Sequence, residues 1–146
     1  MHVAILAGGM GTRLAEETEI RPKPMVEIGG RPILWHILSH FARFGLRDFA
    51  IALGYKGDQI KRFFVDCAEL MGSMTVDLSS GRVDRAEAAT LDWRVHLVDT
   101  GTETNTGGRV RRLRDWLGTG TFLLTYGDGV SDVDIDALPP VKSRQG

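Results

Sequence analysis

A glycine-rich loop directly after a short apolar run constrains the fold of this chain more than any other feature. The apolar run covers Val3–Ala7, and Gly-Gly-Met-Gly-Thr-Arg follows at once at residues 8–13. A short apolar run that ends in glycines is typical of a strand buried on both faces, as in parallel sheets. Consecutive small residues let backbone N–H groups approach phosphate, and an adjacent arginine can bind phosphate oxygens. The loop therefore favours a nucleotide triphosphate site, with a tight turn beside a surface arginine as the alternative.

Two common phosphate-binding motifs do not match this loop. The chain lacks the GxxxxGK[ST] pattern of the P-loop. The dinucleotide fingerprint is also incomplete, because Leu14 stands where a third glycine should follow Gly9 and Gly11. Both differences argue against kinases and dehydrogenases.

The rest of the chain alternates predicted strands with predicted helices. The first expected elements are strand 3–7, helix 32–44 with Pro32 as its first residue and Gly45 as its stop, and strand 48–53. Lys56-Gly57-Asp58 then leads into a second helix whose apolar face runs from Ile60 to Leu70. Strand 93–98, a short helix within 107–117 and strand 121–125 follow. Residues 72–91 interrupt this order, and they are typical of an inserted strand with a hairpin tip or mobile loop. The alternation predicts an α/β fold with a doubly wound, mostly parallel Rossmann-like sheet, whose ligands bind at the carboxyl ends of the strands.

Length and composition limit the possible classes of protein. The 146 residues, 42% hydrophobic with a net charge of -1, predict one folded domain and no nucleic-acid-binding surface. Leu138-Pro139-Pro140 and the polar ending VKSRQG predict that this domain covers 1–138 and that 139–146 form an irregular tail. The single cysteine is ordinary for a reducing compartment. We find neither a secretory pattern at the amino terminus nor an apolar stretch near 18 residues, and we therefore expect a cytoplasmic protein without a membrane partner.

Two further segments carry candidate chemistry. Lys23 lies between Pro22 and Pro24, which fix the backbone around its charge, although a solvated turn is the alternative. Asp128 follows a predicted buried strand and is flanked by Gly127 and Gly129. A carboxylate in such a place can hold Mg²⁺ that carries substrate phosphates, although an Asp-Gly turn is about as compatible with this segment alone.

Other conspicuous side chains receive ordinary structural interpretations. We expect Trp35, His36 and His40 to pack or face solvent, and we expect Cys67 to be a buried, inert thiol. Among the arginines of residues 109–114, only Arg109, next to a glycine pair, is a candidate for the site.

Taken together and in this order, these motifs resemble the sugar-1-phosphate nucleotidyltransferases, over roughly residues 1–138. The segments that carry the resemblance are LAGGMGTRLAEET, KPMVEIGGRPILWHIL, GYKGDQIKRFF, LVDTGTETNTGGRVRRL and TYGDGVSDVDI. They are most similar to the cytidylyl branch, since Thr106-Gly107-Gly108-Arg109 replaces the Gly-Leu-Ala-Gln type segment of the thymidylyl and uridylyl branches. The resemblance implies a sheet of the nucleotide-diphospho-sugar transferase type, truncated at its carboxyl end.

The resemblance also implies an activity and a set of site residues. The reaction would transfer a cytidylyl group from CTP to α-D-glucose 1-phosphate, giving CDP-glucose and pyrophosphate, with Mg²⁺ as cofactor. The implied substrate-binding residues are Leu6, Ala7, Gly8, Gly9, Met10, Gly11, Thr12, Arg13, Lys23, Thr104, Arg109 and Gly127. Arg13 and Lys23 are the implied catalytic residues, acting on the leaving pyrophosphate and the α-phosphate, and Asp128 is the implied metal ligand. The family further suggests a homo-oligomer in nucleotide-sugar and polysaccharide (O-antigen) biosynthesis.

The resemblance stops near Pro139, and the further strands and second metal aspartate of the family have no counterpart here. We therefore expect the nucleotide-binding half of an enzyme with weak or no turnover. Two alternatives to the cytidylyl reaction stay open: a nucleotide-binding module without turnover, and a sibling transferase that uses another base or sugar.

Overall fold

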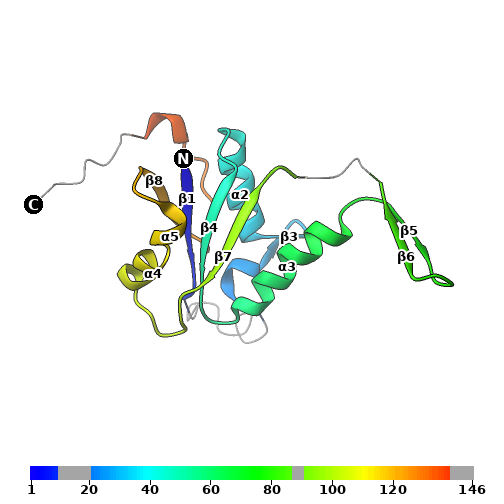
Figure 1. Ribbon diagram of the computed structural model, residues 1–146. Helices are drawn as coiled ribbons and strands as arrows, with labels where there is room; N and C mark the ends of the chain where they lie inside the picture. The colour runs from blue at the N-terminus through cyan, green and yellow to red at the C-terminus, as the bar shows by residue number, and fades with distance from the viewer. Residues whose placement is uncertain (10–20, 87–90, 139–146) are drawn as a thin grey trace, which may run out of the picture.

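The computed structural model describes residues 1–9, 21–86 and 91–138. Its centre is a sheet of four parallel strands in the order β7-β4-β1-β8 (Figure 1). The strands are β1 (His2–Ala7), β4 (Asp48–Leu53), β7 (Arg94–Asp99) and β8 (Phe122–Tyr126). The chain starts in the middle of the sheet, runs outward through β4 and β7, and returns to β8 on the other side of β1. Such a reversal places a ligand crevice at the carboxyl ends of the strands.

Helices cover both faces of the sheet, which confirms the doubly wound α/β fold. On one face, Val3, Ile5, Phe49 and Ile51 pack against α2 (Ile33–Arg43) and α3 (Gly57–Leu70). On the other face, smaller residues such as Ala4, Ala50 and Ala52 contact the region of α4 (Thr106–Arg112) and α5 (Arg114–Leu117). Because side chains alternate along a strand, one apolar run supplies both layers of the core.

Most of the predicted elements agree with the structure to within one residue. The helix predicted over 32–44 begins after Pro32, which is its N-cap and not its first residue, and ends before Gly45, whose φ is 79°. The predicted short helix is two helices, because the chain turns at Leu113, whose side chain is fully buried. The small hairpin of β2 (Glu27–Ile28) and β3 (Arg31–Pro32) was not expected. The same holds for two 3-10 turns, η2 (Lys23–Met25) and η4 (Ile135–Ala137).

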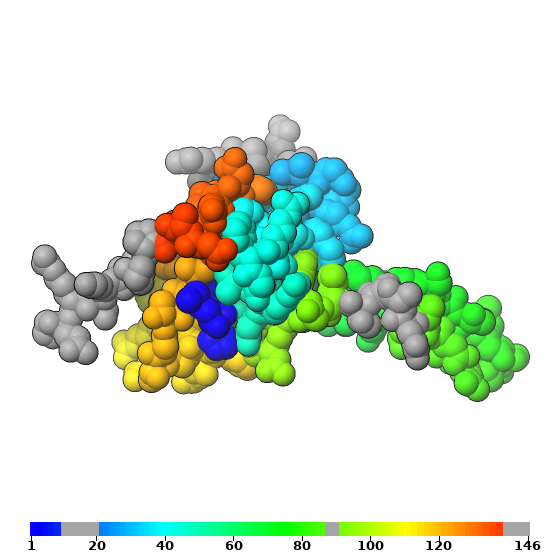
Figure 2. Space-filling view, turned by 90° about the horizontal axis from the view of Figure 1, so that it is seen from above, coloured from blue at the N-terminus to red at the C-terminus, as the bar shows by residue number. Residues whose placement is uncertain are grey.

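The predicted insertion contains an antiparallel hairpin of β5 (Met74–Asp77) and β6 (Arg82–Arg85). It follows α3 and extends away from the sheet (Figure 1), and the space-filling view shows it protruding from one end of the molecule (Figure 2). Residues 87–90 and the predicted tail 139–146 lie outside the described residues.

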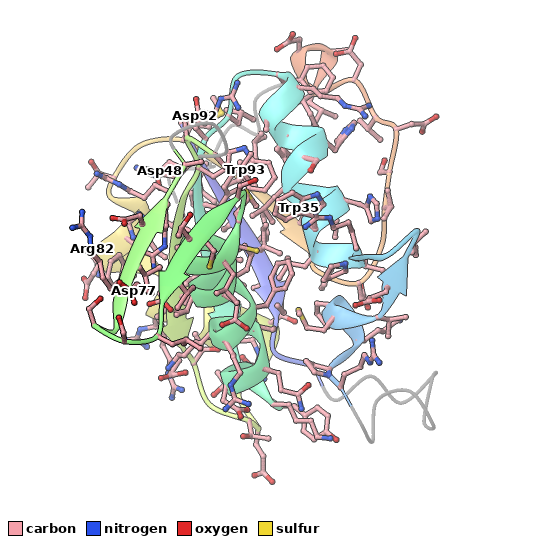
Figure 3. The ribbon with its side chains drawn as sticks, turned by 90° about the vertical axis from the view of Figure 1, so that its right-hand side faces the viewer. Trp35, Asp48, Asp77, Arg82, Asp92 and Trp93 are labelled. Carbon is pink, nitrogen blue, oxygen red and sulfur yellow. The ribbon has the colours of Figure 1, made fainter. Side chains whose placement is uncertain are left out.

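The side chains that were predicted to have ordinary structural roles do pack. The ring of Trp35 lies 4.9 Å from that of Trp93 (Figure 3). His36 and His40 each place Nε2 within hydrogen-bond distance of a backbone carbonyl, at 2.7 Å and 2.8 Å. Cys67 is only partly buried, but burial raises the pKa of its thiol and so disfavours the reactive thiolate.

No helix among the described residues is long and apolar enough to cross a membrane.

Candidate nucleotide-binding site

A cavity of about 390 Å³ lies at the carboxyl ends of the parallel strands, where the topology predicts a ligand. It is lined by Leu6, Ala7, Gly8, Gly9, Lys23, Pro24, Thr102, Glu103, Thr104, Asn105, Thr106, Arg109, Tyr126 and Asp128. The fold thus brings the start of the glycine loop, the Lys23 turn, the α4 region and the Asp128 turn to one place.

Lys23 and Asp128 meet directly although they are 105 residues apart in the chain. Lys23 Nζ donates a hydrogen bond to Asp128 Oδ2 at 3.2 Å. The prolines act as predicted: Pro22 and Pro24 are buried, and Met25 N–H donates to the Pro22 carbonyl to close a tight turn. The Lys23 side chain is 20% exposed and that of Asp128 is 45% exposed. The pair therefore lies at the mouth of the cavity, where both groups can exchange partners with a bound ligand.

Gly127 lets β8 approach the end of β1 closely. Its N–H donates to the Leu6 carbonyl at 2.9 Å. A Cβ atom at this position would lie 3.2 Å from Ala7 Cβ and 3.3 Å from the Leu6 carbonyl oxygen, so a side chain would force the two strand ends apart. Of the predicted glycine loop, the structure describes Gly8 and Gly9. The candidates Met10, Gly11, Thr12 and Arg13 lie outside the described residues.

Arg109 lies on the wall of the cavity, yet its guanidinium group is buried and contacts the protein. It donates to the Thr100 hydroxyl and to the backbone carbonyls of Gly8, Leu53, Gly101 and Thr102, at 2.8–3.3 Å. Burial, followed by the nearby positive charge of Arg112, lowers the pKa of Arg109.

Thr104 contacts the same cluster of charges. Its Oγ1 accepts a hydrogen bond from Arg112 Nη1 at 2.9 Å. The next residue, Asn105, caps α4 by accepting from the Gly108 N–H at 2.8 Å. Arg112 and Thr100 were not among the residues predicted for the site. No local motif marks them, since their importance depends on strand ends that meet only in the fold.

The candidate metal ligand Asp128 could hold Mg²⁺ only together with ligands from substrate phosphates and water. Among the described residues, no group of three or more His, Cys, Asp or Glu side chains could hold a metal ion. Mg²⁺, however, is usually held by one or two carboxylates and takes its other ligands from substrate phosphates and water. An accessible carboxylate beside an anion-binding loop suits that mode, and Asp128 would be its protein ligand.

Comparison with known families decides the kinship of this chain. Residues 3–128 match the family model described as the MobA-like NTP transferase domain. The chain belongs to this family. The match spans β1 through the Asp128 turn, and so it includes every described segment that lines the cavity.

Curated relatives of this NTP transferase domain are similar over most of its length. It is 48% identical over 138 residues to a glucose-1-phosphate cytidylyltransferase of Salmonella typhimurium, with 94% of this chain and 54% of the relative covered. It is 42% identical over 146 residues to a probable glucose-1-phosphate cytidylyltransferase of Bacillus subtilis, with 100% and 57% covered. These matches confirm the resemblance read from the sequence. The chain spans about half the length of these relatives.

Solved structures support the fold independently. The crystal structure of HddC from Yersinia pseudotuberculosis complexed with GMP-PN superimposes with a TM-score of 0.69 at 25% identity, covering 92% of this chain and 51% of that one. That relative carries a guanine nucleotide, whereas the curated relatives above are named for cytidylyl transfer.

Proposed function

We propose that this chain binds CTP and supplies the nucleotide half of a site that transfers its cytidylyl group to α-D-glucose 1-phosphate. The observation that carries the proposal is the contact between Lys23 and Asp128 beside Gly8 and Gly9, in one cavity. A glycine loop, a fixed cation and a carboxylate are the parts that nucleotidyl transfer needs: a phosphate cradle, a neutralising charge and a metal ligand.

In the proposed reaction, a phosphate oxygen of the sugar phosphate attacks the α-phosphorus of CTP. The new P–O bond forms as the bond to the β-phosphate breaks, and pyrophosphate leaves with the bonding electrons. Both substrates are anions, so the protein mainly has to hold them together and neutralise charge. Lys23 would exchange its bond to Asp128 for one to the α-phosphate, and Arg13 would neutralise the leaving group. Mg²⁺ held by Asp128 would screen the phosphate charges.

The choice of base rests on resemblance and chemistry. The segment Thr106–Arg109 is similar to the cytidylyl branch, and its first and last residues line the cavity. Cytosine and uracil differ in the donors and acceptors of one ring edge, so a buried mismatch should reduce binding by about 1–3 kcal/mol. We expect CTP to bind more tightly than UTP in a direct titration. Equal affinity for the two nucleotides would contradict the assignment to cytosine.

The decisive experiment incubates the chain with glucose 1-phosphate, Mg²⁺ and each of CTP, UTP, dTTP and GTP, and records pyrophosphate release. Release with CTP alone supports the proposal. Release with another nucleotide indicates a sibling transferase, for which the GMP-PN complex of HddC makes GTP a specific alternative. CTP binding without release indicates a nucleotide-binding module.

Three further predictions from the sequence belong to the same proposal. They are the need for Mg²⁺, a cytoplasmic location and a homo-oligomeric assembly. Omitting Mg²⁺ from the incubation, or chelating it, should abolish pyrophosphate release, and size-exclusion chromatography with light scattering measures the assembly.

A further inference from the structure

Two neighbouring arginines of α4 join the ends of three strands. Arg109 Nη2 donates to the Gly8 carbonyl after β1, and Arg109 Nη1 donates to the Leu53 carbonyl at the end of β4 and to the Gly101 carbonyl after β7. Arg112 Nη1 donates to the Thr100 carbonyl, and its second contact is the Thr104 hydroxyl. One helix face thereby joins the carboxyl ends of three of the four strands of the sheet.

Thr100 connects these contacts to the core. Its side chain is fully buried, and its hydroxyl donates to the Leu53 carbonyl at 2.7 Å while accepting from Arg109 Nη1 at 2.8 Å. Both hydrogen-bonding functions of the hydroxyl are therefore used. We call Thr100, Arg109 and Arg112 the arginine clamp.

Three glycines provide the space that the arginine clamp occupies. A Cβ atom at Gly8 would lie 1.9 Å from Arg109 Nη1, and one at Gly54 would lie 2.6 Å from the same atom. At Gly101, whose φ is 91°, a Cβ atom would lie 2.9 Å from Arg112 Nη1. The chain is thus shaped around two guanidinium groups, which a surface arginine does not require.

The arginine clamp has no counter-charge of its own. Among the described residues, neither Arg109 nor Arg112 forms an ion pair with a carboxylate, and their contacts are backbone carbonyls and hydroxyls. Arg109 is buried without a charged partner, which is costly, and the exposed Arg112 places a second positive charge beside it. They leave a positive field beside the cavity, which an anionic ligand would neutralise.

The geometry of the peptide bond shows what these contacts do to the backbone. In a trans peptide, the N–H of one residue points opposite to the carbonyl of the residue before it. The carbonyls of Gly8, Gly101 and Thr102 all point at Arg109. The N–H groups of Gly9, Thr102 and Glu103 therefore point away from it, and all three residues line the cavity.

We infer that the arginine clamp is a positioning unit, which turns the N–H groups of Gly9, Thr102 and Glu103 toward the phosphates of a nucleotide. In this role Arg109 acts through the backbone and does not itself bind phosphate. The inference rests on the proposed nucleotide site and adds Thr100 and Arg112 to its working parts. Lysine could not replace either arginine. A planar guanidinium has donors on separate nitrogens that point in different directions, whereas the donors of lysine are all on one ammonium nitrogen.

The test uses inorganic tripolyphosphate as the ligand, because it carries the phosphates without a base or sugar. In the full chain, titration should shift the backbone amide NMR signals of Gly9, Thr102 and Glu103. Arg112→Met should weaken tripolyphosphate binding about tenfold, as expected when a charged group no longer holds its carbonyl. Arg111→Met is the matched control: it removes an equal charge from the neighbouring, exposed position and should weaken binding about twofold or less.

A second pair of variants separates positioning from general destabilisation. Thr100→Val removes the hydroxyl at nearly constant volume and should lose tripolyphosphate affinity as Arg112→Met does. Thr100→Ser keeps the hydroxyl and should bind tripolyphosphate with nearly the wild-type affinity. A wild-type chain whose three amides do not respond to tripolyphosphate would overturn the inference. So would equal effects of Arg111→Met and Arg112→Met, or Thr100 variants that change stability but not affinity. A failure of CTP preference alone would contradict only the proposed base.

Discussion

Lys23 and Arg109 carry the same charge beside the same cavity, but the structure uses them differently. Lys23 is a single ammonium group near the surface with one carboxylate partner, and a ligand can displace that contact. Arg109 is buried, and its donors are already committed to five protein acceptors. A group that acts on a reacting phosphate has to be free to change partners. Lys23 meets this condition and Arg109 does not.

Lys23→Ala should therefore reduce turnover much more than it reduces CTP binding. The proposed contact with the α-phosphate should strengthen as charge develops in the transition state, so its loss should lower kcat by about 100-fold. CTP affinity, measured by titration, should change several-fold at most, since the phosphate contacts proposed for the glycine loop would remain.

The matched control is Lys61→Ala, which removes the exposed ion pair between Lys61 on α3 and Asp99 at the end of β7. It should leave both turnover and CTP affinity within twofold of wild type, as is usual for a surface pair. If Lys23→Ala keeps wild-type turnover, the segment Pro22–Pro24 is a structural turn and nothing more.

Gly54→Ala should destabilise the fold through the arginine clamp. A Cβ atom there would lie 2.6 Å from the Gly8 carbonyl oxygen and 2.9 Å from that of Gly101, and neither backbone can move without losing its bond to Arg109. We expect the free energy of unfolding to fall by about 1–3 kcal/mol, as for an overpacked core. Gly120→Ala, with no atom within 4 Å of its Cβ, should change it little in the same urea titration.

At the scale of elements, the sequence predicts what depends on local pattern and misses what depends on tertiary contact. The strand over 48–53 is predicted to the residue, since a run of apolar side chains buried on both faces needs no other signal. The break at Leu113 is missed because neither glycine nor proline marks it. The hairpin of β2 and β3 could have been found from Gly29-Gly30, whose positive φ values of 61° and 80° are those of a tight turn.

The hairpin of β5 and β6 should depend on pH through Asp77. The Ser79 hydroxyl and N–H both donate to Asp77 Oδ1, which holds the pKa of this carboxyl below its ordinary value of 3.8. A lowered pKa means that ionised Asp77 stabilises the turn above pH 3.8 and that this contribution disappears as the pH falls through the folded-state pKa. An isolated two-stranded hairpin is marginally stable, so the loss should be visible as lower amide-exchange protection factors in β5 and β6.

An NMR titration of the Asp77 carboxyl carbon checks this directly. Ser79→Ala removes the hydroxyl donor and should raise the pKa of Asp77 toward 3.8. Ser73→Ala, at the other end of the hairpin, should leave it unchanged. A pKa of Asp77 that is insensitive to Ser79 would mean that another group stabilises the turn.

For the whole molecule, a parallel sheet could be predicted from the sequence, but the meeting of the site segments in one cavity could not. Alternating strands and helices imply a parallel sheet, and the motifs after β1 and β8 were correctly expected at carboxyl ends. The two motifs come together only because β8 pairs directly with β1, and no local sequence pattern specifies this pairing. The 3.2 Å contact of Lys23 with Asp128 follows from that pairing. The candidates Met10 to Arg13, outside the described residues, stay predictions.

The face around β8 leads to a prediction about the longer relatives. Leu124 and Tyr126 on this edge strand are 48% and 59% exposed, and a hollow of about 250 Å³ lies beside it, lined in part by Phe41, Leu123 and Ile135. The curated relatives are nearly twice as long as the region they share with this chain. We expect their additional half to cover this face and to form the opposite wall of the sugar phosphate site.

Joining the carboxyl-terminal half of the Bacillus subtilis relative after Leu138 should therefore raise turnover far more than it raises CTP affinity. Orienting the second anionic substrate is worth about 100-fold or more in rate, whereas the residues proposed to contact CTP are already present in this chain. The measurement compares pyrophosphate release and CTP titration for the two proteins at equal concentration. The same fusion with Lys23→Ala serves as a control, and it should lose the gain because the rate increase has to act through the same α-phosphate. Equal turnover by the 146-residue chain and by the intact fusion would show that one half is sufficient for orientation.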